Sequence, residues 1–278
     1  MLALFFGLIK LAVAGMICAL GAALPARSAL YLWQRPRLLM RTLLAMYAAV
    51  PLAAVLIDEF VPLGPLARAA LLVLAVSAGA PMLPRKLGPL GNSPYLFSMV
   101  VTSSVLAVAV VPAWVMWLGE HFQLDRSVSP ALIAGAVGRT LLLPLFVGML
   151  LRGLWPVPCE RWANRILAVF GTLLMGLGVI LIAIFGGALA QIPLRAFAAL
   201  GSLLLVALAA GHLLGGPDPD ERTALAITCA TRHVGLAALF AASMPGPNAA
   251  LVVTAYMLCS LVVTTPYLLW RRARTRKP

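Results

Sequence analysis

The side chains best suited to binding or proton transfer form a polar stretch, Thr228–Gly235, inside an otherwise apolar run. It carries two threonines, a guanidinium and an imidazole: Thr228, Thr231, Arg232 and His233. A second interruption is Gly79–Gly91, where Arg85 and Lys86 stand among prolines and glycines. A cation at membrane depth costs roughly 2.5–3.5 kcal/mol, so these groups need a source of negative charge.

Carboxylates do not supply that charge, because all eight lie in loops or at the ends of apolar runs: Asp58, Glu59, Glu120, Asp125, Glu160, Asp218, Asp220 and Glu221. The interior instead holds cationic or titratable side chains: Lys10, Arg85, Lys86, Arg139, Arg232, His212 and His233. Backbone carbonyls freed at helix breaks can balance part of this charge, and a bound anion the rest. The pattern therefore predicts a cavity that attracts anions.

Each cation also has a structural interpretation. Lys10 lies near a span end and is interpreted as reaching back to the interface, and His212 as a packed or interfacial histidine. Arg139 fits a hydrogen bond to a neighbouring helix as well as it fits a site. Arg85–Lys86 could be ordinary residues of the inner surface, and Arg232 could cap the carbonyls of a broken helix.

The composition indicates that the protein lies in lipid and not in water. Of 278 residues, 63% are hydrophobic and 10% are charged, whereas a soluble domain is about a quarter charged. Apolar runs of about 20 residues without alternation are typical of membrane-spanning helices and exclude a barrel. The net charge of +13 is better explained by basic cytoplasmic loops than by nucleic acid. The four cysteines show no metal or disulfide spacing.

We expect an all-α polytopic membrane protein with nine transmembrane helices in one domain, 1–278. The spans lie near 3–25, 38–57, 64–90, 95–118, 130–152, 162–186, 194–215, 219–244 and 248–270. With the basic tail 271–277 inside, most arginines fall inside, and only Arg68, Arg126 and Arg195 fall outside. The N-terminus is therefore predicted outside and the C-terminus in the cytoplasm. The expected membrane is a plasma membrane, the inner membrane of a bacterium. We treat Met1–Ala29 as a retained helix and not as a signal peptide.

Interrupted spans in both halves of a chain are typical of inverted-repeat transporters. No hydrolase, nucleotide-binding or metalloprotease motif is present, so an intramembrane enzyme has no support from spacing.

The chain resembles the bile acid:sodium symporter family over nearly its whole length. The resemblance is carried by the order of several short motifs: Gly15–Gly21, Arg35–Pro36, Gly79–Pro81, Ser98–Thr102, Ala224–Ile227 and Gly235–Ala238. It implies two inverted repeats of five helices, the first lacking its first helix. A panel domain would contain the spans 3–25, 130–152 and 162–186. A core domain would contain 38–118 and 194–270, with the third and eighth spans broken and crossing. Substrate would bind between panel and core and move by alternating access.

This chain departs from the family's sodium-coupled pattern. By the resemblance, Thr228 replaces a shared glutamate, Arg232 a glutamine, His233 an asparagine and Met46 a further glutamine. Sodium prefers several oxygen ligands and a negative charge, so fixed cations at these positions would repel it.

We therefore expect a secondary transporter of a small organic anion in the lipid bilayer, sodium-independent, with no metal or other cofactor. Coupling would be uniport, exchange, or proton transfer through His233, whose ordinary pKa lies near neutrality. The expected substrate or ion site is Arg85, Lys86, Ser98, Thr102, Thr228, Thr231, Arg232 and His233. The alternative is a receptor or structural module that kept the fold without transport.

Overall fold

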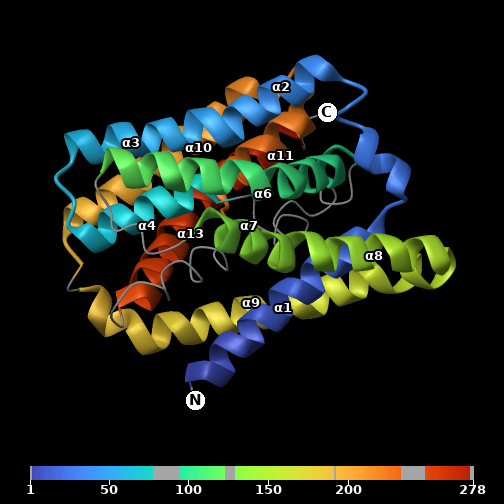
Figure 1. Cartoon of the computed structure of the whole chain (residues 1–278), viewed down its shortest axis with the longest axis horizontal. Helices are drawn as coiled ribbons and strands as arrows, with labels where there is room; N and C mark the ends of the chain where they lie inside the picture. Colours follow the sequence, from blue (N-terminus) through green and yellow to red (C-terminus); the bar gives the residue numbers. More distant parts are fainter. Residues whose placement is uncertain (1, 78–93, 123–128, 191, 233–247, 276–278) are drawn as a thin grey trace. The chain divides into compact units, whose positions relative to one another are not determined.

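The computed structural model describes residues 2–77, 94–122, 129–190, 192–232 and 248–275. These residues fold into helices and form no strand (Figure 1). Helix is present in each of the expected spans among the residues described, so the all-α polytopic fold is confirmed. The number of membrane crossings and the inverted repeat stay predictions.

The helices have the following bounds. The first half of the chain contains α1 (Leu2–Ala23), the 3-10 turn η1 (Ala26–Leu30), α2 (Pro36–Leu44), α3 (Val50–Phe60), α4 (Pro65–Val76) and α6 (Pro94–His121). The second half contains α7 (Pro130–Val137), α8 (Leu143–Leu154), α9 (Pro156–Leu189), α10 (Leu194–Leu214), α11 (Pro219–Ala230) and α13 (Asn248–Thr275). Two π-helical turns, η2 (Ala45–Ala49) and η4 (Gly138–Leu142), join α2 to α3 and α7 to α8.

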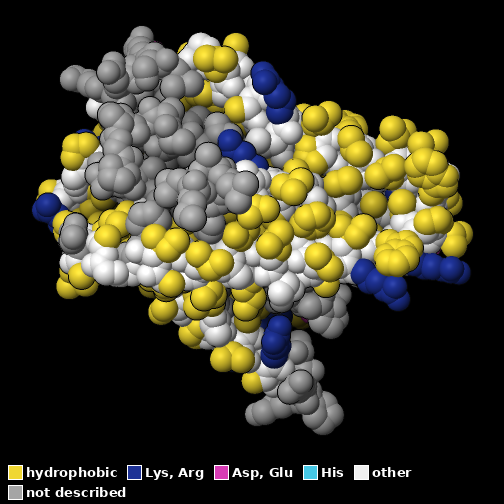
Figure 2. Space-filling model, turned by 90° about the horizontal axis from the view of Figure 1, so that it is seen from below, with side chains coloured by type: hydrophobic (Ala, Val, Ile, Leu, Met, Phe, Trp, Pro, Cys, Tyr) yellow, Lys and Arg dark blue, Asp and Glu magenta, His cyan; other side chains and the backbone are white. Residues whose placement is uncertain are grey.

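Five helical stretches of the described chain are long and apolar enough to cross a membrane: Pro36–Phe60, Pro94–His121, Pro130–Leu154, Pro156–Ile184 and Leu194–Leu214. Hydrophobic side chains cover much of the face seen in Figure 2. Large hydrophobic side chains are exposed along the described helices, among them Val169, Val179 and Ile184 on α9. A surface of this kind is stable against lipid tails and not against water.

Proline marks the start of many helices. It occupies the first helical position in Pro36, Pro65, Pro94, Pro130, Pro156 and Pro219. The missing N–H of proline costs nothing there, because the first N–H groups of a helix have no intrahelical acceptor. The positions of the spans therefore follow from proline as well as from the apolar runs.

Proline also explains the two π-helical turns. Pro51 lies two residues beyond η2, and Pro144 lies two residues beyond η4. A proline inside a helix clashes with the carbonyl four residues before it and cannot bond to it. Widening the preceding turn relieves that clash.

The chain divides into two compact units. Unit 1 contains Met1–Leu39 and Val76–Leu177. Within it α1 packs along α8, and α6 packs against α7 and η1. A Cβ atom at Gly148 of α8 would collide with the Cys18 carbonyl of α1, so the two backbones meet at a position that only glycine fits.

Unit 2 contains Met40–Ala75 and Gly178–Pro278. Within it α10 contacts α3, η2, α11 and α13, and Figure 1 draws α3 and α10 side by side. Gly211 of α10 lies against the backbone of α11, where an added Cβ would come within 2.5 Å of the Ala226 Cα. This close packing holds α11, which carries Thr228 and ends two residues before Arg232. The division into panel and core stays a prediction.

Candidate functional site

The candidate site lies where α11 ends inside its expected span. The helix stops at Ala230, and Thr231 is extended, with φ −105° and ψ 96°. Arg232 follows with a side chain that is only 1% exposed, among the largest fully buried side chains of the described residues. A guanidinium at this depth requires polar partners, because burial of an unpaired charge is very costly.

One partner of the Arg232 guanidinium is a backbone carbonyl of η2. Its Nη2 donates a hydrogen bond to the Met46 carbonyl oxygen over 3.1 Å. The residues are distant in sequence but lie together in unit 2. A carbonyl that accepts from a charged donor makes a stronger bond than one that accepts from a neutral group.

The Met46 carbonyl is available because of Pro51. In η2 the Val50 N–H donates to the Ala45 carbonyl, five residues back. The next bond in this register would run from residue 51 to Met46, but proline has no N–H. The π-helical turn therefore leaves an acceptor that the guanidinium uses.

Tyr256 of α13 completes the end of α11. Its hydroxyl accepts a hydrogen bond from the Arg232 backbone N–H over 2.6 Å. The same hydroxyl donates to the Ala230 carbonyl over 2.9 Å. One buried hydroxyl thus satisfies two backbone groups at the end of α11 and fixes that end to α13.

The threonines beside Arg232 bond within their own helix. The Thr228 hydroxyl donates to the Ala224 carbonyl over 2.7 Å, and the Thr231 N–H donates to the Ile227 carbonyl over 2.8 Å. Both side chains are buried. Across the described ranges, no group of three or more His, Cys, Asp or Glu is arranged to hold a metal.

Ser98 and Thr102 lie on α6 in unit 1 and are also buried. The Ser98 hydroxyl accepts from the Leu32 N–H over 3.0 Å and donates to the Ala29 carbonyl over 2.6 Å. The Thr102 hydroxyl accepts from the Trp33 Nε1–H over 3.2 Å. Both hydroxyls therefore hold the segment that follows α1.

The other residues of interest divide into three groups. Arg85, Lys86 and His233 lie outside the described residues. Lys10 and Arg139 are exposed. The His212 Nδ1 lies 2.9 Å from the Tyr267 hydroxyl, and its ring also faces Trp270, so it packs among aromatic side chains.

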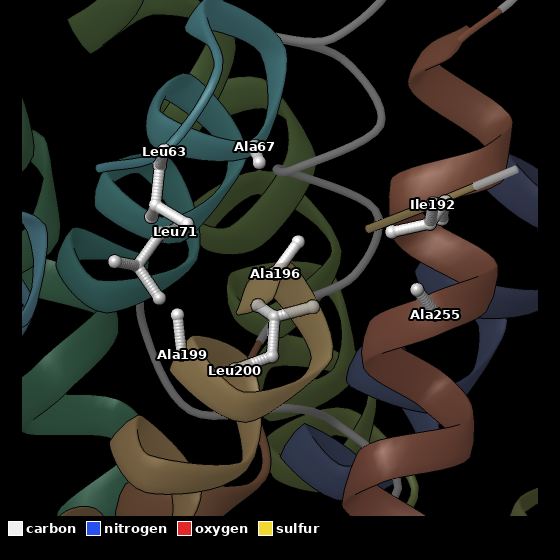
Figure 3. A pocket seen from close by; sticks show the side chains of 8 residues that line it. All are labelled: Leu63, Ala67, Leu71, Ile192, Ala196, Ala199, Leu200 and Ala255. Atoms are coloured by element: carbon white, nitrogen blue, oxygen red, sulfur yellow. The ribbon is translucent and has the colours of Figure 1, made fainter. Parts of the chain in front are cut away.

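A small apolar pocket lies elsewhere in unit 2 (Figure 3). Its lining comes from α4, α10, α13 and the segments before α4 and α10: Leu63, Ala67, Leu71, Ile192, Ala196, Ala199, Leu200 and Ala255. It offers no polar side chain, so it does not by itself recognise a charge.

Two contributors to the site were not predicted from the sequence. Pro51 in the middle of a span was a visible signal, because it predicts an unpaired carbonyl one turn earlier. Tyr256 gave no such signal, because a tyrosine in an apolar helix does not indicate which helix end it will cap.

The helical fold of the described residues, the apolar surface and the buried cation just beyond the end of α11 define a polytopic membrane protein with an internal polar site. The model of the Sodium Bile acid symporter family matches residues 10–195, more than half of the chain. The chain therefore belongs to this family, whose members are membrane transporters and not enzymes. A search of curated proteins found no match. The matched region ends before α11, so Arg232 lies beyond it, whereas its acceptor Met46 lies within it.

Proposed function

We propose that the protein is a secondary transporter that carries a small organic anion by alternating access without sodium. The buried Arg232 guanidinium, bonded to the Met46 carbonyl, carries this proposal. The resemblance assigns sodium-site residues to positions 46, 228 and 232. Positions 232 and 46 are joined by a hydrogen bond in unit 2, and its donor is the fixed cation of Arg232.

Coulomb repulsion gives the size of the effect. Two unit charges 4 Å apart repel by about 4 kcal/mol at an effective dielectric constant of about 20. That energy weakens sodium binding about a thousandfold. The glutamate that would offset the repulsion is replaced by Thr228, whose hydroxyl proton is already used within α11.

The substrate side of the proposal rests on the same charge. A guanidinium binds a carboxylate through two parallel hydrogen bonds, which makes a small organic acid the expected cargo. Arg85, Lys86 and His233 would add to the site, with His233 as the proton carrier if transport is proton-coupled. The proposed orientation places the N-terminus outside and the C-terminus in the cytoplasm, in a bacterial inner membrane.

The test is uptake by proteoliposomes. Labelled carboxylates that raise the melting temperature of the purified protein would be offered in sodium buffer and in choline buffer. We expect equal uptake in both buffers and loss of uptake in Arg232→Ala. Uptake that needs sodium and persists in Arg232→Ala would contradict the proposal. A ligand that binds without entering the vesicles would favour the non-transporting receptor.

A gain-of-function variant sharpens this test. The triple change Thr228→Glu, Arg232→Gln and His233→Asn restores three of the four residues of the sodium-coupled pattern and removes the fixed charge at position 232. We expect uptake by this variant to become sodium-dependent. The control is Arg222→Gln, which removes a cation whose side chain bonds to the Gly216 carbonyl near the start of the same helix. Sodium dependence in the control, or none in the triple variant, would contradict the assignment of these positions.

A further inference from the structure

Residues 26–37, which run from η1 into the first turn of α2, have two different faces. Its inner face is fixed to α6 through Ser98 and Thr102, as described above. Leu32 is fully buried, and the Tyr31 ring meets the Tyr95 ring edge to face at 6.4 Å. These contacts hold the segment in one conformation against α6.

The outer face combines cations with large apolar side chains. Arg27, Arg35 and Arg37 are exposed. Leu30 and Trp33 are also exposed, by 54% and 57%. The Arg35 guanidinium carbon lies 4.0 Å from the centre of the Tyr31 ring, which holds that cation close to the surface of the segment.

The segment contains no aspartate or glutamate. Another basic and aromatic segment of unit 1, residues 152–165, differs in this respect. There Glu160 lies 3.2 Å from the Arg152 guanidinium and offsets part of the charge. Residues 26–37 therefore offer an anion a stronger positive surface than residues 152–165 do.

We propose that residues 26–37 bind the headgroup of an anionic phospholipid. The segment directly follows α1, whose apolar length places its end at the membrane surface. Arginines bind phosphate oxygens, and a tryptophan beside them is typical of the headgroup level. A soluble anion would use the arginines but would leave Leu30 and Trp33 in water. A phospholipid accounts for both kinds of side chain, since its acyl chains cover the apolar ones.

The surface is independent of the proposed substrate and of sodium coupling. It requires only that the protein lies in a membrane, and the leaflet follows from the orientation. Because Trp33 and Leu32 bond to α6, a bound lipid holds the same segment that Thr102 and Ser98 hold from inside.

Native mass spectrometry of the full chain tests the proposal by titration with phosphatidylglycerol, phosphatidylcholine and glycerol phosphate. The variant R27Q/R35Q/R37Q removes the three exposed cations of residues 26–37. The variant R152Q/R161Q/R165Q removes the same number of charges from the other basic segment. An arginine near an anionic lipid surface contributes about fivefold in binding. We expect about a hundredfold loss of phosphatidylglycerol binding in the first variant and little loss in the second.

Three outcomes would overturn the inference. Equal losses in the two variants would show general attraction of charge, and equal binding of the two phospholipids would show no headgroup recognition. Competition by glycerol phosphate at the same concentration as phosphatidylglycerol would show a site for a soluble anion. If the triple variant fails to fold, Arg27→Gln alone serves, because no stacking contact is removed. Its expected loss is about fivefold, and an unchanged affinity would also overturn the inference.

Discussion

Replacing Arg232 with methionine should end transport and leave the protein about as stable as before. The change keeps much of the side-chain volume and removes the charge. The Met46 carbonyl loses its charged donor, which costs about 1–3 kcal/mol. The change also removes the desolvation penalty of the buried charge, and because its partner is a neutral carbonyl no opposite charge is left unpaired; replacement of whole buried ion pairs by apolar groups is often neutral or stabilising by about 1–4 kcal/mol. Because Arg232 is only 1% exposed, both effects apply nearly in full and oppose each other.

The net change should therefore stay within about 2 kcal/mol, or about 5 °C in melting temperature for a chain of this size. Thermal unfolding of the purified protein in detergent measures it, and proteoliposome uptake measures transport. Arg232→Lys is the matched variant, because it keeps the charge but loses the planar fork of donors. It should be less stable than Arg232→Met.

Two results would refute this reasoning. A fall of more than about 5 °C in Arg232→Met would mean that the guanidinium contributes more than about 2 kcal/mol of net stability. Uptake that persists in Arg232→Met would mean that the charge serves no transport function. The backbone bond from Arg232 to Tyr256 is retained in every variant, so neither result could come from its loss.

Two further predictions concern backbone contacts. Gly148→Ala forces a Cβ against the Cys18 carbonyl and should destabilise the protein by about 1–3 kcal/mol, whereas Gly153→Ala, with open space around it, should leave the melting temperature unchanged or higher. Similar losses in both would argue against the close α1–α8 contact. Pro51→Ala restores an N–H that competes for the Met46 carbonyl, so uptake should fall while the melting temperature holds. Unchanged uptake would disconnect the π-helical turn from the site.

The sequence allowed the helices to be predicted because the length of an apolar run reflects the thickness of the membrane core. The end of α11 at Ala230 coincides with the small and polar residues that interrupt the apolar run, and the broken span itself stays a prediction. The acceptor of Arg232 was not predictable, since it lies 186 residues away on another helix. Ser98 was expected at an ion or substrate site, and the structure shows its hydroxyl bonded to residues 29 and 32. A hydroxyl group does not reveal its partner until the fold is known.

The acceptor at Met46 has a consequence for mutational scanning. The atom that bonds to Arg232 belongs to the peptide backbone, so every amino acid at position 46 supplies it equally. An alanine scan would therefore report position 46 only through the packing of its buried side chain. Genetic control of this contact lies at Pro51, the residue whose missing proton leaves the carbonyl available. A position can thus be essential through a neighbour five residues away and still tolerate replacement of its own side chain.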